Sequence, residues 1–271
     1  MKSVTAFIGS GRRNGVTYRA TRQLLDNLQS FGDIRSEIVF LSDCNLGLCQ
    51  GCKACILRGE EFCPLHDDRD ALIDRMTRSD GVVFASPVYS FQVSALMKAF
   101  LDRLGFALHR PRFHGKTFTS IAVEGLYGGS AVVKYLDFVG GALGFNVVKG
   151  SSIVCRKNPN TASEPMMEEE RRMMDQALAR HGRRFHERLS SPAFPAPSML
   201  QLWGFRTART SIRLELGDEY RDHVYYRDHG WFDSDYYYPT QLGPLKRAAG
   251  AAFDRMAARS SRPREYHRPE R

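Results

Sequence analysis

The chain begins with a short apolar run that ends in a glycine-rich turn and passes directly into a helical pattern. The run extends from Val4 to Ile8, and the turn is Gly9-Ser10-Gly11. Apolar residues then recur with the 3.6-residue spacing of an amphipathic helix, at Val16, Ala20, Leu24, Leu25 and Leu28. This order predicts a buried strand that feeds a helix, which is the repeating unit of an α/β fold.

Strand and helix patterns alternate as far as residue 154. Further strands are predicted over 36–41, 81–85, 118–123 and 145–154, with helical patterns between them. Five strands joined by helices predict a parallel sheet that is covered on both faces. Such sheets bind ligands at the carboxyl ends of their strands.

The composition changes after this alternating region. A long charged helix is predicted from Ser163 to about Leu189, followed by a proline-rich linker over 190–197, an aromatic region and a last helix over 242–259. We therefore predict an α/β domain over 1–190 and a helical C-terminal extension over 191–271, whose basic tail is expected to be disordered.

Charge and hydropathy narrow the possible functions. The formal net charge is +9, but no groove-reading motif accompanies it, so nucleic acid is not expected as a partner. No apolar run approaches the roughly 20 residues that span a bilayer, and the first residues do not resemble a signal peptide. A cytoplasmic protein without a membrane partner is expected.

The turn after the first strand has the composition of an anion-binding loop. It reads Gly9-Ser10-Gly11-Arg12-Arg13-Asn14-Gly15-Val16-Thr17. Free backbone N–H groups at a helix N-terminus bind phosphate, hydroxyl and amide side chains donate hydrogen bonds, and arginine adds charge. The spacing matches neither the dinucleotide motif nor a Walker loop. A plain strand-to-helix turn capped by Thr17 is the alternative.

Two further loops follow predicted strands. Pro87-Val88-Tyr89-Ser90-Phe91 could form an apolar wall for a flat ring, although buried aromatic residues of a core-facing turn would look the same. Glu124-Gly125-Leu126-Tyr127-Gly128-Gly129 is a glycine-rich turn after the next strand.

Together these three loops resemble those of the NADPH-dependent FMN reductase and iron–sulfur flavoprotein families. The resemblance covers about residues 1 to 155, and the loops occur in the same order. It implies a flavodoxin-like three-layer sandwich with a five-stranded parallel sheet in the order 2-1-3-4-5. It also implies FMN, bound by the first domain, and NAD(P)H as electron donor.

The resemblance implies an FMN site in three parts. The phosphate would lie on Ser10, Arg12, Asn14, Gly15, Val16 and Thr17. The ring would lie along Pro87, Val88, Tyr89, Ser90 and Phe91, and against Glu124, Gly125, Tyr127, Gly128 and Gly129. Glu124 stands where these families commonly have a small or hydroxyl residue. No catalytic acid or base is predicted, because the flavin ring itself accepts a hydride.

Cysteines are the most unusual feature of the sequence. Cys49-x-x-Cys52-x-x-Cys55 is followed by Cys63-Pro64, a spacing from which four thiolates can converge on a metal. The pattern resembles that of iron–sulfur flavoproteins, where four such cysteines hold a [4Fe-4S] cluster. Free or redox-active thiols that shape the loop, and a zinc ion, are the alternatives.

Function follows from these features as three hypotheses. The first is an NAD(P)H-dependent flavin oxidoreductase that passes electrons to a quinone, a free flavin or a redox protein. The second is a non-enzymatic iron–sulfur flavoprotein that carries electrons. The third is a zinc-stapled interaction module. The resemblance also implies a homo-oligomer, either a dimer or a tetramer.

Overall fold

A computed structural model describes residues 1–156 and 168–262 of the chain. These residues form two compact units. The first comprises residues 1–49, 67–104 and 111–193, and the second comprises 50–66, 105–110 and the chain from Phe194 onward. The start of the predicted long helix and the end of the basic tail lie outside the described residues. Among the described residues, no helix combines the length and apolarity that crossing a bilayer requires.

The first unit is a flavodoxin-like α/β sandwich. Its strands are β1 (Lys2–Ile8), β2 (Ile34–Phe40), β3 (Gly81–Tyr89), β4 (Gln92–Val93), β5 (Thr117–Glu124), β6 (Asn146–Val147) and β7 (Ser151–Val154). The main sheet runs β2-β1-β3-β5-β6 with parallel pairing, so the predicted order 2-1-3-4-5 is confirmed.

The sheet has seven strands rather than the predicted five, for two local reasons. The predicted fifth strand is divided into β6 and β7, because four steps from Val147 to Ser151 face only three steps on β5, from Phe118 to Ile121. At this bulge Gly150 donates its N–H to Asp137 at 3.0 Å, not to the ladder. The other addition, β4, forms a short antiparallel hairpin with β3.

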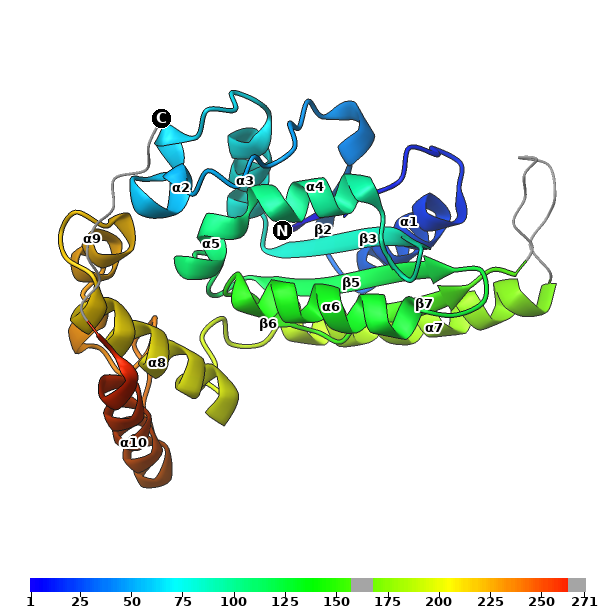
Figure 1. Ribbon diagram of the computed structural model, residues 1–271. Helices are drawn as coiled ribbons and strands as arrows, with labels where there is room; N and C mark the ends of the chain where they lie inside the picture. Colours follow the sequence, from blue (N-terminus) through cyan, green and yellow to red (C-terminus); the bar gives the residue numbers. More distant parts are fainter. Residues whose placement is uncertain (157–167, 263–271) are drawn as a thin grey trace. The chain divides into compact units, whose positions relative to one another are not determined.

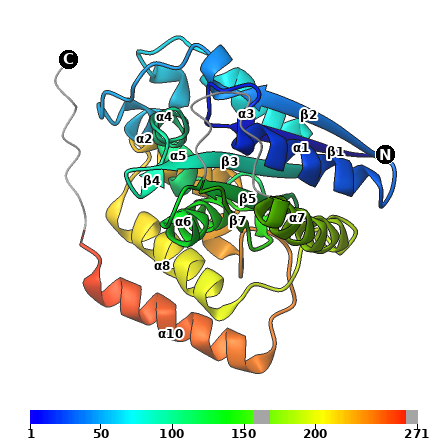
Figure 2. The ribbon, with the colours of Figure 1, turned by 90° about the vertical axis from the view of Figure 1, so that its right-hand side faces the viewer.

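Helices cover both faces of this sheet (Figures 1 and 2). They are α1 (Val16–Gln29), α3 (Arg69–Arg78), α4 (Ala95–Arg103), α6 (Gly129–Ala142) and α7 (Glu168–Leu189), with a 3₁₀ turn at Leu41–Asp43. Alternate residues of β1 point to opposite faces. Val4, Ala6 and Ile8 pack with α1 and α7, whereas Phe7 stacks on Phe100 of α4. Both faces of the sheet are therefore apolar, as expected for buried parallel strands.

The second unit is helical. It contains α2 (Ala54–Leu57), α5 (Gly105–His109), α8 (Met199–Glu215), α9 (Arg221–Asp228) and α10 (Pro244–Ser260), with 3₁₀ turns at Glu60–Phe62 and Trp231–Asp233. Phe205, Tyr226, Trp231 and Tyr236 form its aromatic core. Arg206 of α8 binds Asp254 of α10 at 2.9 Å. The segment that carries Cys52, Cys55 and Cys63 belongs to this unit, together with the C-terminal extension.

Candidate FMN site

The three predicted binding loops lie side by side in the first unit. β1, β3 and β5 are parallel neighbours, so the loops after them leave the same edge of the sheet. Ser94, at the start of α4, joins the first two loops by donating its hydroxyl to the carbonyl of Gly9 at 2.5 Å. The rings of Phe91 and Tyr127 stack at 5.1 Å and join the second and third loops. The sheet therefore assembles one continuous site from distant parts of the sequence.

The first loop leaves the N-terminus of α1 open. Gly15 occupies the cap position, no side chain caps the helix, and its first turn carries no acidic residue. Within the described residues, the N–H groups of Val16, Thr17 and Tyr18 donate to no carbonyl or side chain. Unpaired N–H groups at the positive end of a helix dipole are what a phosphate group requires. This end of α1 fits the phosphate of FMN.

The two arginines of the first loop differ in availability. Arg13 binds Asp43 through two hydrogen bonds of 2.7 and 2.8 Å, and its guanidinium lies 5.0 Å from the ring centre of Phe40. Arg12 is exposed and has no ion-pair partner among the described residues. Of the two arginines, Arg12 is therefore the one whose guanidinium is available to bind an anion.

The other predicted phosphate ligands lie close to the same helix end. Ser10 is buried, and its hydroxyl accepts the N–H of Arg12 at 3.2 Å. Gly15 donates its N–H to the carbonyl of Arg12 at 3.2 Å, which closes the turn. Asn14 is exposed and Thr17 is buried in the first turn of α1. The loop is thus held by its own hydrogen bonds without using the first amides of the helix.

The second loop runs from a buried strand end to an exposed hairpin tip. Pro87 is buried and Val88 is half-buried, whereas Tyr89, Ser90 and Phe91 are exposed. Two serines, Ser86 and Ser94, hold this loop. Ser86 accepts the N–H of Ser94 at 2.9 Å and donates its hydroxyl to the carbonyl of Pro87. The two serines lie eight residues apart at the ends of the loop, and this spacing is a signal that sequence analysis could have used.

The third loop rests on a buried carboxylate. Glu124 ends β5 and accepts hydrogen bonds from the N–H of Gly129, at 2.8 Å, and from the hydroxyl of Ser152. Gly129 begins α6, and a Cβ there would lie 2.0 Å from the Ser152 hydroxyl oxygen. Gly128 has a positive φ of 105°, while Gly125 and Tyr127 are exposed. The side chain of Glu124 therefore supports the turn from within the protein.

Two aspartates close the base of the cysteine loop. Asp68 precedes α3 but makes no side-chain cap; it accepts the N–H of Asn45 at 2.7 Å. Asp67 accepts the N–H of Gly47 at 2.9 Å and binds the buried Arg103 at 2.8 Å. Burial acts to raise the pKa of Asp67, but these hydrogen bonds outweigh it and lower the pKa overall.

The cysteines do not form a metal-ligand set in this structure. Cys49 and Cys52 are exposed, Cys55 is half-buried and Cys63 is buried. Across residues 1–156 and 168–262, no three Cys, His, Asp or Glu side chains come together as metal ligands. The three loops of the first unit fit FMN, whereas Cys52, Cys55 and Cys63 of the second unit do not come together as a ligand set.

In the second unit, a buried arginine holds the segment that carries Cys55. Arg110 donates to the carbonyl of Cys55 at 2.6 Å and to Glu60 at 3.0 Å, and it forms an ion pair with Asp222 of α9. Asp222 also binds His109 at 2.9 Å. No sequence pattern indicated this cluster, because its members are up to 167 residues apart.

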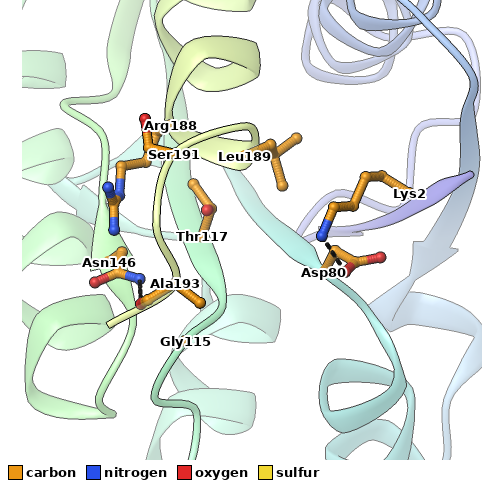
Figure 3. A pocket seen from close by; sticks show the side chains of 9 residues that line it. All are labelled: Lys2, Asp80, Gly115, Thr117, Asn146, Arg188, Leu189, Ser191 and Ala193. Atoms are coloured by element: carbon orange, nitrogen blue, oxygen red, sulfur yellow. Dashed lines mark hydrogen bonds and ion pairs between the residues drawn. The ribbon is translucent and has the colours of Figure 1, made fainter. Parts of the chain in front are cut away.

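A small hollow lies at the opposite edge of the sheet, among Lys2, Asp80, Asn146 and Arg188 (Figure 3). Its volume is about 40 Å³, which suits one or two water molecules and is far too small for a flavin nucleotide. This hollow therefore does not compete with the carboxyl-end loops as the cofactor site.

An α/β sandwich with an open helix end and two further loops at the carboxyl edge of its sheet is the arrangement of a flavodoxin-like flavoprotein. Residues 2–159 match the family model described as NADPH-dependent FMN reductase. The chain belongs to this family and is a flavin oxidoreductase.

Relatives agree with this assignment. The chain is 36% identical over 160 residues to an iron–sulfur flavoprotein of Archaeoglobus fulgidus, a match that covers 55% of this chain and 71% of that protein. It is 40% identical over 52 residues to YwqN of Bacillus subtilis, a putative NAD(P)H-dependent FMN-containing oxidoreductase, covering 19% of this chain and 29% of YwqN. The flavodoxin-like fold recurs in the crystal structure of RosB with a bound riboflavin-phosphate derivative. That likeness has a TM-score of 0.54 at 14% identity, over 90% of this chain and 92% of RosB.

Proposed function

We propose that this chain is an NAD(P)H-dependent FMN oxidoreductase that passes electrons to an acceptor such as a quinone, a free flavin or a redox protein. The open N-terminus of α1, beside two loops that can flank a ring, carries the proposal. FMN bound there would take a hydride from the nicotinamide and release electrons to the acceptor. The protein's part is to bind and orient, which needs no side-chain acid or base.

The proposed roles follow the three loops. The N–H groups of Val16 and Thr17, with Ser10, Asn14, Gly15 and the free Arg12, hold the phosphate. The second loop lines the ring through Pro87, Val88, Tyr89, Ser90 and Phe91. The glycine-rich turn, held from within by Glu124, lines the other side through Gly125, Tyr127, Gly128 and Gly129.

The test is to purify the full chain, measure bound flavin by absorbance, and then follow NADH and NADPH oxidation with and without a quinone. Bound FMN and acceptor-dependent turnover would support the oxidoreductase. Bound FMN without turnover would favour a pure electron carrier. A chain that neither carries FMN nor binds it when added would contradict the proposal.

A second candidate is a flavoprotein that also carries an iron–sulfur cluster. The spacing of Cys49, Cys52, Cys55 and Cys63, and the name of the Archaeoglobus relative, favour it. Cluster binding would require residues 49–63 to rearrange from the placement described here. Iron and acid-labile sulfide near four per chain in anaerobically purified protein would support it, and their absence, with thiols that all titrate freely, would contradict it.

A further inference from the structure

The cysteine segment of the second unit, residues 50–66, has no apolar core of its own. No side chain of α2 or of the 3₁₀ turn Glu60–Phe62 is buried. An isolated helix as short as α2 is not stable in water, because fixing its first turn costs more than its few hydrogen bonds return. Lys53, directly before α2, also has a positive φ of 59°, which costs free energy for a residue with a side chain. Contacts from outside the segment must therefore hold it in place.

One buried arginine supplies such contacts. The side chain of Arg110 is fully buried and donates hydrogen bonds to the carbonyl of Cys55, at 2.6 Å, and to that of Ile56, at 3.4 Å. It also binds the carboxylate of Glu60 at 3.0 Å. Arg110 thus holds the chain between Cys55 and Cys63 at two points, within α2 and at the start of the 3₁₀ turn.

The C-terminal extension fixes this arginine in turn. The helices α2 and α9 lie side by side (Figure 1). Asp222 of α9, whose side chain is only 6% exposed, forms an ion pair with Arg110 and binds the ring of His109 at 2.9 Å. A buried guanidinium needs a nearby carboxylate, since an unpaired buried charge is costly. Asp222 therefore determines whether Arg110 stays in the position from which it holds the segment.

The shielded cysteines of the segment are the two that flank these contacts. Cys52 is exposed, whereas Cys55 is half-buried and Cys63 is buried. A thiol reacts only when a reagent can reach it. Cys63, and to a smaller extent Cys55, therefore depend on the placement of the segment for their protection.

We propose that Arg110 and Asp222 form a latch through which the C-terminal extension keeps the turn between Cys55 and Cys63 closed. When the ion pair breaks, the segment has no core to hold it and opens as one local unit. The extension thereby controls when the two thiols are accessible for reaction. This device lies outside the FMN site and does not depend on the proposed function.

The test is alkylation of the full chain by iodoacetamide, with the labelling rate of each cysteine followed by peptide mass spectrometry. In the wild-type chain Cys52 should react fast and Cys63 slowly. Asp222→Asn removes the charge that fixes Arg110 and keeps the shape of the side chain. The labelling rate should then rise about 30-fold at Cys63 and about fivefold at Cys55, and change less than twofold at Cys52.

Asp254→Asn is the matched control. Asp254 of α10 binds Arg206 at 2.9 Å and Arg209 at 2.7 Å, so its loss weakens another ion-pair network of the same unit and leaves Asp222 in place. The labelling rate of Cys63 should stay within about threefold of the wild-type value. Equal acceleration by both variants would mean that the whole unit loosens, and would overturn the latch.

Glu60→Gln tests the other end of the latch in a chain that keeps the buried pair of Arg110 and Asp222. It weakens only the hold on the 3₁₀ turn, so the labelling rate of Cys63 should rise about fivefold, with little change in melting temperature. Unchanged labelling of Cys63 in both Asp222→Asn and Glu60→Gln would contradict the proposal. Equally slow labelling of Cys52 and Cys63 in the wild-type chain would mean that something other than the latch shields them, and would also overturn it.

Discussion

The α/β unit and the helical unit are stabilised by different kinds of contact. In the α/β unit, alternating apolar side chains of the central strands fill two faces that helices cover. In the helical unit, Arg110 and Arg206 are buried among carboxylates, beside an aromatic core, whereas in the α/β unit the buried pair Arg103–Asp67 accompanies a larger apolar core. Apolar packing depends on pattern and volume and tolerates substitution, whereas a buried charge depends on one particular partner. The helical unit should therefore be the more sensitive to single substitutions.

The strongest test of this contrast is Asp222→Ala. The change leaves the fully buried Arg110 without its partner on α9 and removes the hydrogen bond to His109. Arg110 keeps Glu60 and the carbonyl of Cys55, so the loss of this one buried carboxylate should lower the free energy of unfolding by about 3 kcal/mol. Urea denaturation followed by tryptophan fluorescence measures it, because both tryptophans lie in the helical unit.

Asp233→Ala is the control for that experiment. Asp233 pairs with Arg213 in the same unit, but the two side chains are 84% and 55% exposed. An exposed pair contributes at most about 1 kcal/mol. If Asp222→Ala had no larger effect than Asp233→Ala, the contrast between the units would be wrong.

A second test adds a charge to the α/β unit at a half-buried position that packs against its apolar core. Val16→Glu places a carboxylate at the open N-terminus of α1, where the dipole should stabilise the FMN-free protein by about 0.3–1 kcal/mol relative to Val16→Gln, which loses the same apolar contact. The same carboxylate would repel the phosphate, so the Kd for FMN should rise about 100-fold, equivalent to about 2.8 kcal/mol. Fluorescence titration measures the Kd, and thermal melting measures the stability.

Val16→Gln is the matched control, since it has nearly the same shape as Val16→Glu and no charge. Its Kd for FMN should stay within a few-fold of the wild-type value. Equal weakening by both variants would show that side-chain size, and not charge, sets the affinity, and the phosphate would then not lie at this helix end.

The same contrast explains which parts could be predicted from the sequence. The helix α1 was predicted from Val16 to about Leu28 and extends from Val16 to Gln29, because apolar periodicity is a local signal. The break between β6 and β7 was not predicted, since it depends on Asp137 taking the N–H of Gly150. The C-terminal extension was predicted to be helical, which is confirmed, but the positions of α8 and α9 within it were not predicted.

Long-range polar contacts limited the prediction of the site in the same way. The order of β1, β3 and β5 places the three loops together, and that order was predicted from the resemblance to flavodoxin-like families. The partners of Arg13 and Glu124 are Asp43 and Ser152, which are about 30 residues away and carry no periodic signal. The sequence therefore identified the loops but not which side chains remain free to meet a ligand.

A third test concerns a histidine that the α/β unit buries without a charged partner. His181 of α7 is fully buried, and its ring contacts only the hydroxyl of Thr119, at 2.6 Å, among the described hydrogen bonds. Burial lowers the pKa of His181 from 6.5 to about 3. Below pH 6.5, His181 is therefore protonated in the unfolded chain, whereas in the folded chain it stays neutral until the pH falls to about 3. This contribution to stability is present above pH 6.5 and is lost as the pH falls through that window.

Between pH 7 and pH 5 the loss should be about 2 kcal/mol. Urea denaturation of the wild-type protein and of His181→Leu, at both values, isolates it, because the leucine variant lacks only this titration. The wild-type free energy of unfolding should fall by about 2 kcal/mol more than that of the variant. Parallel losses in both proteins would mean that protonation of His181 is not linked to unfolding.

The smallest expected effect comes from Glu124, a buried carboxylate of the α/β unit that can be compared with Asp222 of the helical unit. Asp222 faces a guanidinium, but Glu124 accepts hydrogen bonds from two neutral donors, the N–H of Gly129 and the hydroxyl of Ser152. Glu124 should therefore act on the shape of the glycine-rich turn and only through it on FMN. Glu124→Ala should raise the Kd for FMN about tenfold, or by about 1.4 kcal/mol. Glu124→Gln, which still accepts the N–H of Gly129, should raise it only about twofold.

Ser152→Ala completes a double-mutant cycle for this pair. If Ser152 acts through Glu124, the effects of Glu124→Ala and Ser152→Ala on the Kd should fall short of additivity by about 0.5–1 kcal/mol. Full additivity would mean that the two residues influence FMN separately. A loss of affinity in Glu124→Gln as large as in Glu124→Ala would instead show that the negative charge itself matters. Glu124 would then depend on its charge, as Asp222 does. The two units would differ less in their use of buried charge than their packing indicates.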